Sequence, residues 1–379
     1  MVLLIEKVIS GYGGDYVDVT LACDIMMDFE SSIQPAIYLA EELVRRGYIV
    51  SMMSPVMSVD VEQRLLAKGI QPVNLRVKLF TKSLGLSLTW FEAWGWEASI
   101  RLSSHLAGIG SSASINFSQM IAVPAQVWYL QGWPSVALRD IDKELPTGFR
   151  VAYKVLKPLI EYFDEKLISR MRDISALVVA NSKFCASMYS PFGVKVNDVI
   201  YPPLDCLTFR PSTSSPSSNY VLTYFGKETK SSVVKRIADA GVKIKAFGSK
   251  APFIRRELVE HPNIEFLGRV SASKLLEVYS NALFTLFTFT HEPFGYVPIE
   301  SMACGTPVLT YNVQGPSEYL TSAFTGWLVY TDDELVQKAV DLWKEGYPLH
   351  MRGNCIKVAS KFDVSVYLEK WLKILSTIL

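Results

Sequence analysis

The chain has 379 residues, 49% of them hydrophobic and 20% charged, and its 38 basic and 37 acidic residues leave a net charge of +1. This length suits two domains, the composition excludes global disorder, and the charge balance gives no electrostatic drive toward nucleic acid. The mean hydropathy of +0.20 is high for a soluble protein. Yet no apolar run approaches the ~18 residues that a membrane-spanning helix requires.

The first residues and the cysteines favour a cytoplasmic protein. Residues 1–10 reach a charge after five positions and contain no small-residue cleavage site, so we expect no signal peptide. The cysteines are odd in number, scattered and without a CxxC pair: Cys23, Cys185, Cys206, Cys304 and Cys355. They resemble neither a disulfide framework nor a zinc site, and a reducing compartment fits them.

In the first half, short apolar runs alternate with amphipathic stretches, the pattern of β-α units on a parallel sheet. We predict strands at 17–25, 48–54 and 176–182, and a helix at 31–47 that ends at Gly47. The second half repeats the pattern, with strands at 219–226, 242–248, 263–268 and 283–289 and helices at 271–282 and 364–379. Between the halves, the Pro- and Ser-rich, nearly uncharged segment 208–219 predicts an interdomain linker.

The most informative segment is 290–319, which follows the last of these strands. Pro298 requires a helix to begin near Gly295, because proline is tolerated only in the first helical turn. Gly305 is a natural end for this helix, and Pro307 prevents its continuation. The helix N-terminus therefore points at the carboxyl edge of the sheet, where open α/β folds bind ligands.

This predicted helix start has the chemistry of an anion site between two carboxylates. Backbone N–H groups near Phe294, Gly295 and Tyr296, together with the helix dipole, suit a diphosphate. Glu292 precedes the helix and Glu300 lies inside it, at most ~12 Å apart if the span is helical. One acid could lie near a sugar and the other near a ribose, because carboxylates accept paired bonds from neighbouring hydroxyls. From two glutamates alone, the plainer interpretation is favoured: Glu292 pairs with the helix dipole and Glu300 is solvated.

The segment resembles the E-x7-E signature of glycosyltransferase family 4, in the GT-B superfamily, whose members typically read E-G-F-G-x-x-x-x-E-A-M-A-C-G-x-P-V. The matching residues here are Glu292, Phe294, Gly295, Glu300, Met302, Ala303, Cys304, Gly305, Pro307 and Val308. Residues 263–282 and 199–211 are similar to two further family segments. The resemblance covers about residues 176–379 and is weak over residues 1–150.

The resemblance implies an α/β GT-B fold, in which two Rossmann-like domains with parallel sheets face a central cleft. The acceptor-side domain is expected at 1–207, completed by the C-terminal helix 364–379, and the nucleotide-sugar-binding domain at 208–363. The implied activity is that of a retaining hexosyltransferase. It would move a sugar from a nucleoside-diphosphate sugar to a glycan or lipid-linked acceptor, with no metal and no other cofactor.

The resemblance also implies residue roles in the donor site. Glu292 would lie by the transferred sugar, Glu300 would hold the ribose hydroxyls, and the amides of Phe294 to Tyr296 would hold the phosphates. The backbone around Arg269 would meet the base. Gly226 begins the diphosphate loop.

Several family positions carry other residues. In the diphosphate loop, Lys227 stands where members have arginine, and Lys230 comes earlier than the usual lysine. We expect at least one of these lysines to contact the diphosphate, although lysine offers a point charge without a bidentate fork. The alternative is that both are exposed turn lysines. The Gly-Gly pair before Ser317 appears as Gln314 and Gly315, a second Gly-Gly is absent from 24–32, and Gln131 stands where many members have a histidine.

Three other features carry weaker predictions. Asp140 and Asp142 form a D-x-D that follows no clear strand, so we expect a solvated segment and not a metal site. His291 could orient Glu292 or only occupy the turn. In residues 76–101, three basic residues precede Trp90, Phe91, Trp94 and Trp96. That mixture suits the cytoplasmic face of a membrane or a lipid-linked acceptor, and the alternative is that the aromatic residues are core or line a cleft.

Two other classes of function stay open. One is another GT-B enzyme, such as a nucleotide-sugar epimerase, which would convert the donor without an acceptor. The other is a sugar-nucleotide-binding subunit without activity of its own, which the altered diphosphate loop and the missing Gly-Gly pair keep open.

Overall fold

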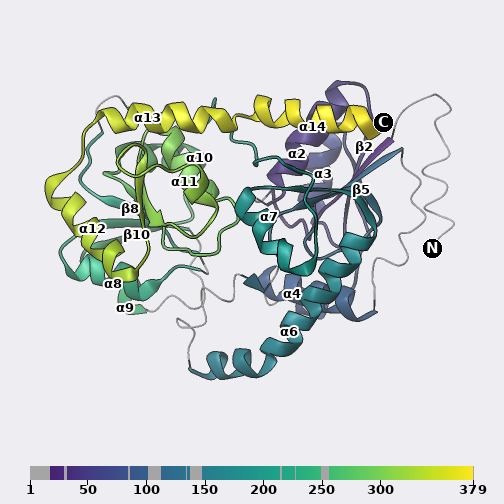
Figure 1. Ribbon diagram of the computed structural model, residues 1–379, viewed down its shortest axis with the longest axis horizontal. Coiled ribbons are helices and arrows are strands. Elements are labelled where there is room, and N and C mark those ends of the chain that lie inside the picture. The colour runs from purple at the N-terminus through teal and green to yellow at the C-terminus, as the bar shows by residue number, and fades with distance from the viewer. Residues whose placement is uncertain are drawn as a thin grey trace.

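The computed structural model describes residues 18–29, 32–83, 86–100, 112–133, 135–136, 147–213, 216–226, 228–248 and 256–378. Two parallel sheets, each covered by helices, form two lobes that lie side by side in Figure 1. The predicted alternation of strands and helices is therefore confirmed in both halves of the chain.

The first sheet has seven parallel strands in the order β3-β2-β1-β4-β5-β6-β7. Its strands are β1 Asp18–Ala22, β2 Ile49–Ser54, β3 Gln71–Asn74, β4 Ala113–Asn116, β5 Ala125–Leu130, β6 Ser175–Ala180 and β7 Asp198–Val199. The helices of this lobe are α2 Gln34–Arg45, α3 Val59–Ala67, α4 Leu86–Ile100, α6 Thr147–Asp173 and α7 Lys183–Tyr189, with short 3-10 turns η1 Phe80–Ser83 and η4 Ser190–Phe192. The strand order reverses between β1 and β4, where doubly wound sheets place their ligand crevice.

The second sheet has six parallel strands in the order β10-β9-β8-β11-β12-β13. They are β8 Val221–Tyr224, β9 Ile244–Phe247, β10 Ile264–Gly268, β11 Thr285–Leu286, β12 Val308–Tyr311 and β13 Gly326–Val329. Helices α8 Ser231–Asp239, α9 Arg256–Val259, α10 Ala272–Asn281, α11 Tyr296–Ala303 and α12 Asp332–Glu345 cover it, with η5 Gly315–Glu318. Its switch point lies between β8 and β11.

Local sequence signals set where many of these helices begin and end. Ser58, Ser271 and Thr331 are the N-caps of α3, α10 and α12, and each side chain accepts a bond from a backbone N–H three residues on. Such caps satisfy amides that the first helical turn leaves without a partner. Gly47, with φ of 90°, follows α2 as predicted, because a left-handed turn there favours glycine.

The chain crosses between the two lobes twice, and the two crossings lie against each other. The first follows β7 into the linker, and the second runs from α13 His350–Ala359 through η6 Ser360–Phe362 to α14 Val364–Ile378. Leu204 joins them: its N–H donates to the Phe362 carbonyl at 2.8 Å, and its carbonyl accepts from Val364 N–H at 3.1 Å. Figure 1 shows α13 over one lobe and α14 over the other, along the upper edge.

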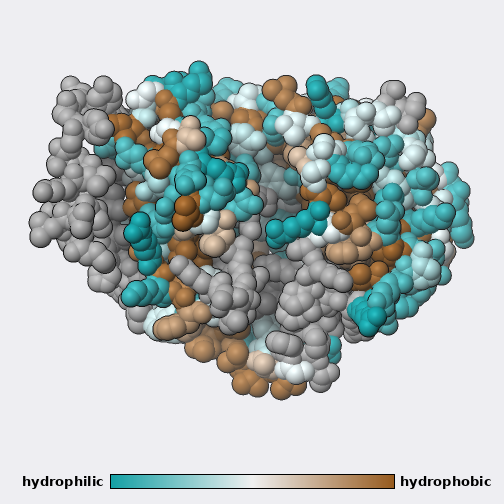
Figure 2. Space-filling view, turned by 180° about the vertical axis from the view of Figure 1, so that it is seen from behind, coloured by the Kyte–Doolittle hydropathy of each residue, from teal (hydrophilic) through white to brown (hydrophobic). Residues whose placement is uncertain are grey.

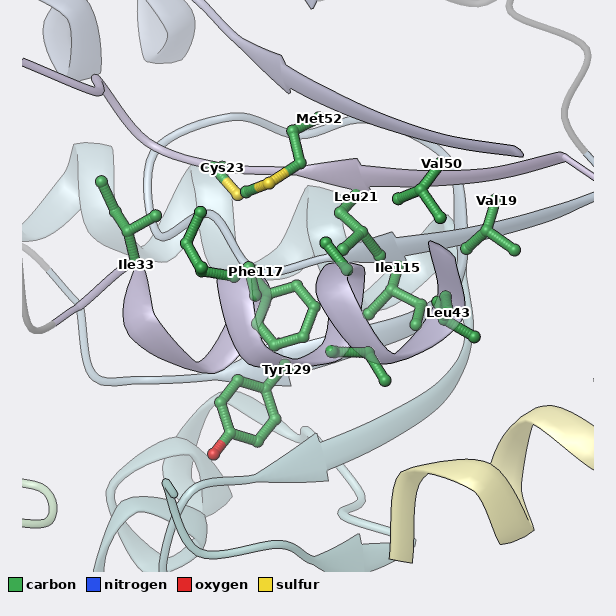
Figure 3. Packing of buried hydrophobic residues seen from close by; sticks show 14 of the residues in the cluster. Val19, Leu21, Cys23, Ile33, Leu43, Val50, Met52, Ile115, Phe117 and Tyr129 are labelled. Carbon is green, nitrogen blue, oxygen red and sulfur yellow. The ribbon is translucent and has the colours of Figure 1, made fainter. Parts of the chain in front are cut away.

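Helix α14 completes the hydrophobic core of the first lobe. Trp371 is fully buried, with its ring 5.5 Å from that of Phe117 and 5.6 Å from that of Tyr129 between centroids. Figure 3 shows Phe117 and Tyr129 below the strands that carry Leu21 and Ile115. The Tyr367 hydroxyl also donates to the Pro35 carbonyl of α2, at 2.7 Å. Because truncating a buried large aromatic side chain costs about 3–5 kcal/mol, these contacts hold the end of the chain on the first lobe.

The described part of residues 76–101 includes η1 and α4 and packs partly into the core. Trp94 is buried and meets Phe163 of α6 edge to face, with ring centroids 5.5 Å apart. For Trp94 the alternative of a core residue is therefore correct, whereas Phe80 and Trp96 are exposed. Within the described ranges, no helix is both long enough and apolar enough to cross a bilayer.

Candidate active site

Helix α11 begins and ends where its glycines and prolines predict. Gly295 is its N-cap, with φ of 89°, and a Cβ there would come within 2.8 Å of the Pro316 ring. Pro298 lies buried in the first turn. Gly305 follows the helix with φ of 80°, and its N–H donates to the Met302 carbonyl at 2.9 Å. The turn before α11 thus needs glycine both for its backbone conformation and for space.

The N-terminus of α11 is occupied by the protein's own carboxylate. Glu292 Oε1 accepts a bond from Gly295 N–H at 3.1 Å and a longer one from Phe294 N–H at 3.5 Å. A negative charge is favourable at this end of a helix. This contact is the one that the plainer interpretation of Glu292 predicts, with the helix start holding a carboxylate of its own chain.

The replacement of the family's first glycine by Gln314 has a structural reason. Gln314 is buried; its amide oxygen accepts from Glu292 N–H at 3.4 Å, and its amide nitrogen donates to the Thr310 hydroxyl at 2.7 Å. Gly315 is different, because a Cβ there would lie 2.0 Å from the Pro293 carbonyl oxygen. Its N–H donates to the Glu292 carbonyl at 2.9 Å, so the retained glycine fixes the turn that carries Glu292.

Glu300 is not a solvated helix residue, so the plainer interpretation of this glutamate is wrong. The Tyr279 hydroxyl, which is fully buried, donates to Glu300 Oε2 at 3.1 Å. Burial raises the pKa of Glu300 to about 8, and the bond from Tyr279 opposes that rise. The carboxyl is therefore mostly protonated at neutral pH and can donate one hydrogen bond as well as accept others.

Glu300 opens onto a cavity of about 290 Å³ that both lobes and the linker enclose. The cavity is lined by Gln34, Tyr38, Pro203, Leu204, Asp205, Thr208, Phe209, Tyr296 and Glu300. The buried Tyr296 hydroxyl has no hydrogen-bond partner among the described residues. Burial, with the nearby charges of Asp205, Glu41 and Asp363, raises the pKa of Tyr38 to about 12, so its phenol stays neutral. A carboxyl and two neutral phenols around one cavity suit a ligand rich in hydroxyl groups.

Lys230 is not an exposed turn lysine, although it caps the start of α8. Its side chain is 21% exposed, and Nζ lies 2.9 Å from Asp332 Oδ1 and 4.2 Å from the centre of the Tyr311 ring. The Tyr311 hydroxyl donates to the same Asp332 oxygen at 2.6 Å. Lys227 lies outside the described residues. The role of both lysines at a phosphate stays a prediction.

Gly226 ends the first strand of the second lobe in a tight turn. A Cβ there would lie 2.5 Å from the Tyr224 ring, and the Gly226 N–H donates to the Thr229 hydroxyl at 3.0 Å. The Thr229 hydroxyl in turn donates to the Tyr224 carbonyl at 3.0 Å. Glycine is required at this position by space, and its amide is used inside the turn.

Arg269 is exposed on the loop after β10 and faces the first lobe. The pKa of Asp28, which follows β1, is held below its usual value first by a bond from Phe29 N–H and then by Arg64. The charge of Arg269 adds to the same lowering, which places it near Asp28 across the two lobes. A role for this loop at a base stays a prediction.

The carboxyl ends of the two sheets are joined by contacts that the sequence did not indicate. Ser182, after β6, donates to the Pro293 carbonyl at 2.5 Å. Glu318 of η5 accepts bonds from Lys183 N–H at 3.1 Å and Phe184 N–H at 2.5 Å, at the start of α7. These contacts set the segment carrying Glu292 against the first lobe.

Other candidates from the sequence lie as follows. Gln131 donates to the Phe117 carbonyl at 2.8 Å, so its amide is bonded within the first lobe. His291 Nδ1 lies 3.1 Å from the Thr290 hydroxyl. The D-x-D at 140–142 lies outside the described residues. In the part of the chain that the structure describes, no three His, Cys, Asp or Glu side chains gather as a metal site would require.

Two doubly wound domains meet here at the carboxyl ends of their parallel strands, with a helix start that holds the Glu292 carboxylate and a cavity lined by Glu300 at the junction. This is the GT-B fold of glycosyltransferases. Anabaena HepE, solved in complex with UDP and glucose, shares it with a TM-score of 0.66 at 17% identity, over 95% of this chain and 99% of that one.

Sequence comparison points to the same class of protein. Residues 255–362, which include both glutamates of the motif, match the family described as Glycosyl transferases group 1. An uncharacterized glycosyltransferase of Methanocaldococcus jannaschii is 37% identical over 67 residues, 18% of this chain and 17% of that protein. An alpha-1,3/1,6-mannosyltransferase of Neurospora crassa is 38% identical over 69 residues, 18% of this chain and 15% of that protein. The chain thus aligns with only about a sixth of the length of these two curated relatives.

Proposed function

We propose that this protein is a retaining glycosyltransferase of family 4 that uses a nucleoside-diphosphate sugar. The observation that carries the proposal is the start of α11, where the amides of Gly295 and Phe294 already hold the carboxylate of Glu292. A diphosphate offers the same site more charge and more acceptor oxygens than a carboxylate does. The match of residues 255–362 to Glycosyl transferases group 1 supports this assignment.

Donor binding displaces Glu292 from the helix start. Phosphate oxygens then take the amides of Phe294, Gly295 and Tyr296, and the freed carboxylate turns to the hydroxyls of the transferred sugar. Glu300 bonds the ribose hydroxyls, which its place on the wall of the cavity supports. Lys230 exchanges Asp332 for a phosphate, since both partners are anionic oxygens and the lysine lies at the start of α8.

The chemical step uses the charge that develops on the leaving group. The bond from the anomeric carbon to the phosphate oxygen breaks, and the acceptor oxygen bonds to the same face of that carbon. The acceptor's proton passes to the leaving diphosphate, so no separate base is required. Lys230 and the α11 amides stabilise the leaving negative charge. Closure of the two lobes excludes water and limits hydrolysis of the donor.

The comparisons suggest which donor and acceptor to test first. HepE was solved with UDP, and the Neurospora relative is a mannosyltransferase. We propose a hexose as the transferred sugar and a glycan or lipid-linked glycan as the acceptor. No metal is required in this proposal, because amides and a lysine carry the phosphate charge.

A thermal-shift panel with UDP, GDP, ADP and dTDP, with and without a divalent metal, tests donor binding. A ligand that binds only the folded state at 100 times its Kd adds about 2.7 kcal/mol to the free energy of unfolding. We expect one diphosphate to raise Tm without metal, and Lys230→Met to reduce that rise. The matched control is Lys235→Met on the same helix, whose lysine pairs with Asp239 at the surface. No rise with any nucleotide would contradict the proposal.

Product analysis then separates the remaining functions. Transfer to an acceptor with the donor's anomeric configuration, read by NMR, supports a retaining transferase. Conversion of the nucleotide sugar with no acceptor present would identify an epimerase. Nucleotide binding without turnover of any sugar donor by the purified chain would identify a binding subunit.

A further inference from the structure

The N-terminal half of α6 carries an exposed row of large apolar side chains. We call Val151, Val155, Leu156, Leu159 and Tyr162 the α6 apolar row; each is about half exposed or more, and Val155 is 73% exposed. In Figure 1 this half of α6 projects at the lower edge of the molecule, and Figure 2 shows hydrophobic surface along that edge. Contiguous apolar surface of this kind marks an interaction site.

The α6 apolar row faces outward because the opposite side of the helix is already used. At 100° per residue, Val151, Val155, Leu159 and Tyr162 fall within an arc of about 80°. Ile160, Phe163 and Leu167 pack instead into the core of the first lobe, against Trp94 and its neighbours. The row cannot turn inward without pulling these residues out.

Basic residues flank the α6 apolar row. From Thr147 to Ile160 the helix contains Arg150, Lys154 and Lys157 and no acidic residue. Glu161 is the first acid, at 3.8 Å from Lys157, and Lys166 lies 5.8 Å from the Tyr162 ring at the far end. A second copy of this helix would bring like charges together, whereas an anionic surface complements them.

We propose that the α6 apolar row is a docking surface for an anionic lipid bilayer. The first 16 residues of α6, about 24 Å of helix, lie in the plane of the headgroups. Val151, Val155, Leu159 and Tyr162 enter the boundary with the acyl chains, and Lys154 and Lys157 pair with lipid phosphates. The contact lies at the edge of the molecule opposite α13 and α14, so the bridging helices stay clear of the membrane.

The proposal is tested by flotation of the full chain with vesicles. One set contains phosphatidylcholine alone and the other contains phosphatidylcholine with phosphatidylglycerol, at low and at physiological salt. The charge variant is Lys154→Gln with Lys157→Gln, and the apolar variant is Val155→Ser with Leu159→Ser. The matched controls, Lys344→Gln and Leu349→Ser, change exposed residues of the second lobe. Melting curves establish that each variant folds.

We expect binding to the anionic vesicles that weakens with salt and is nearly absent with phosphatidylcholine alone. The charge variant should lower the partition coefficient about 30-fold, since each basic residue near the surface contributes about fivefold. The apolar variant should lower it about tenfold or more, and the controls should leave it unchanged. Equal binding by wild type and both α6 variants would overturn the proposal. A dimer that is seen by light scattering and that dissociates in the Val155→Ser variant would also overturn the proposal. Transfer to a soluble acceptor does not depend on this surface. Loss of vesicle binding and loss of glycosyl transfer are therefore separate results.

Discussion

Replacing Glu300 by glutamine should make the protein more stable at alkaline pH and leave its stability near pH 5 almost unchanged. Burial raises the pKa of this carboxyl from 4.5 to about 8. In the unfolded chain the Glu300 carboxyl ionises near pH 4.5. Below that pH the carboxyl is protonated in both states, so its burial then takes nothing from the free energy of unfolding. The free energy of unfolding falls as the pH rises from 4.5 to about 8, because the carboxyl ionises in the unfolded chain but stays protonated in the folded protein. Glutamine has no such titration, so the variant escapes this loss.

The size of the effect follows from the pKa change. A change of one unit in pKa is worth about 1.4 kcal/mol, so the full change sets a ceiling of about 5 kcal/mol above pH 8. The side chain lines an open cavity and is only partly buried, and solvent there screens part of the cost of ionisation. We therefore expect a gain of about 1–3 kcal/mol for Glu300→Gln near pH 9.

Urea denaturation near pH 5, 7 and 9 measures the free energy of unfolding of both proteins. The matched control is Glu277→Gln, which changes an exposed glutamate of α10 that pairs with Lys274. Of the two variants, only Glu300→Gln should become more stable than wild type as the pH rises. A constant difference between wild type and Glu300→Gln across this range would refute the reasoning, because the carboxyl would then titrate alike in the folded and unfolded states.

Three further predictions concern the surrounding contacts. Glu318→Ala removes the acceptor for two α7 amides and should lower the free energy of unfolding by about 1–3 kcal/mol in urea titrations; an unchanged midpoint would count against this lobe-to-lobe contact. Lys230→Met should weaken binding of the stabilising nucleoside diphosphate about tenfold in calorimetry, whereas equal affinity would show that Lys230 remains paired with Asp332. Gly315→Ala places a Cβ 2.0 Å from the Pro293 carbonyl oxygen and should lower the free energy of unfolding by at least about 2 kcal/mol; a Tm within one degree of wild type would contradict that geometry.

Local patterns in the sequence predicted β1, β2 and β6 of the first sheet, β8 to β11 of the second, and the limits of α11, whereas β3, β4, β5 and β7 were not predicted. Pro298 and Gly305 restrict the backbone directly, so the start and end of that helix depend on no distant residue. The sequence also predicts a linker at 208–219, because Pro and Ser leave a segment without the periodicity of a helix or a strand. The E-x7-E spacing then placed one acid just before this short helix and the other inside it.

The chemical state of those acids was decided only when distant segments came together. For Glu300 the sequence offered a solvated residue or one that holds ribose hydroxyls. The burial that raises its pKa comes from distant segments, because the cavity beside it is lined by residues of α2 and the linker. Lys230 was expected at a phosphate or, as the alternative, at an exposed turn, and its partner Asp332 lies about a hundred residues further along the chain. Neither the cavity beside Glu300 nor the pairing of Lys230 with Asp332 can be recognised from the local periodicity of the sequence.

What the sequence determined by itself is therefore the alternation of strands and helices, the turn chemistry around Gly295 and Gly305, and the spacing of Glu292 and Glu300. These depend on dihedral limits and on the periods of helix and strand. The tertiary structure decided the pKa of Glu300, the contact of Glu318 with α7, and the outward face of α6. Burial and pairing are properties of segments far apart in the chain, and they exist only once the two sheets have packed.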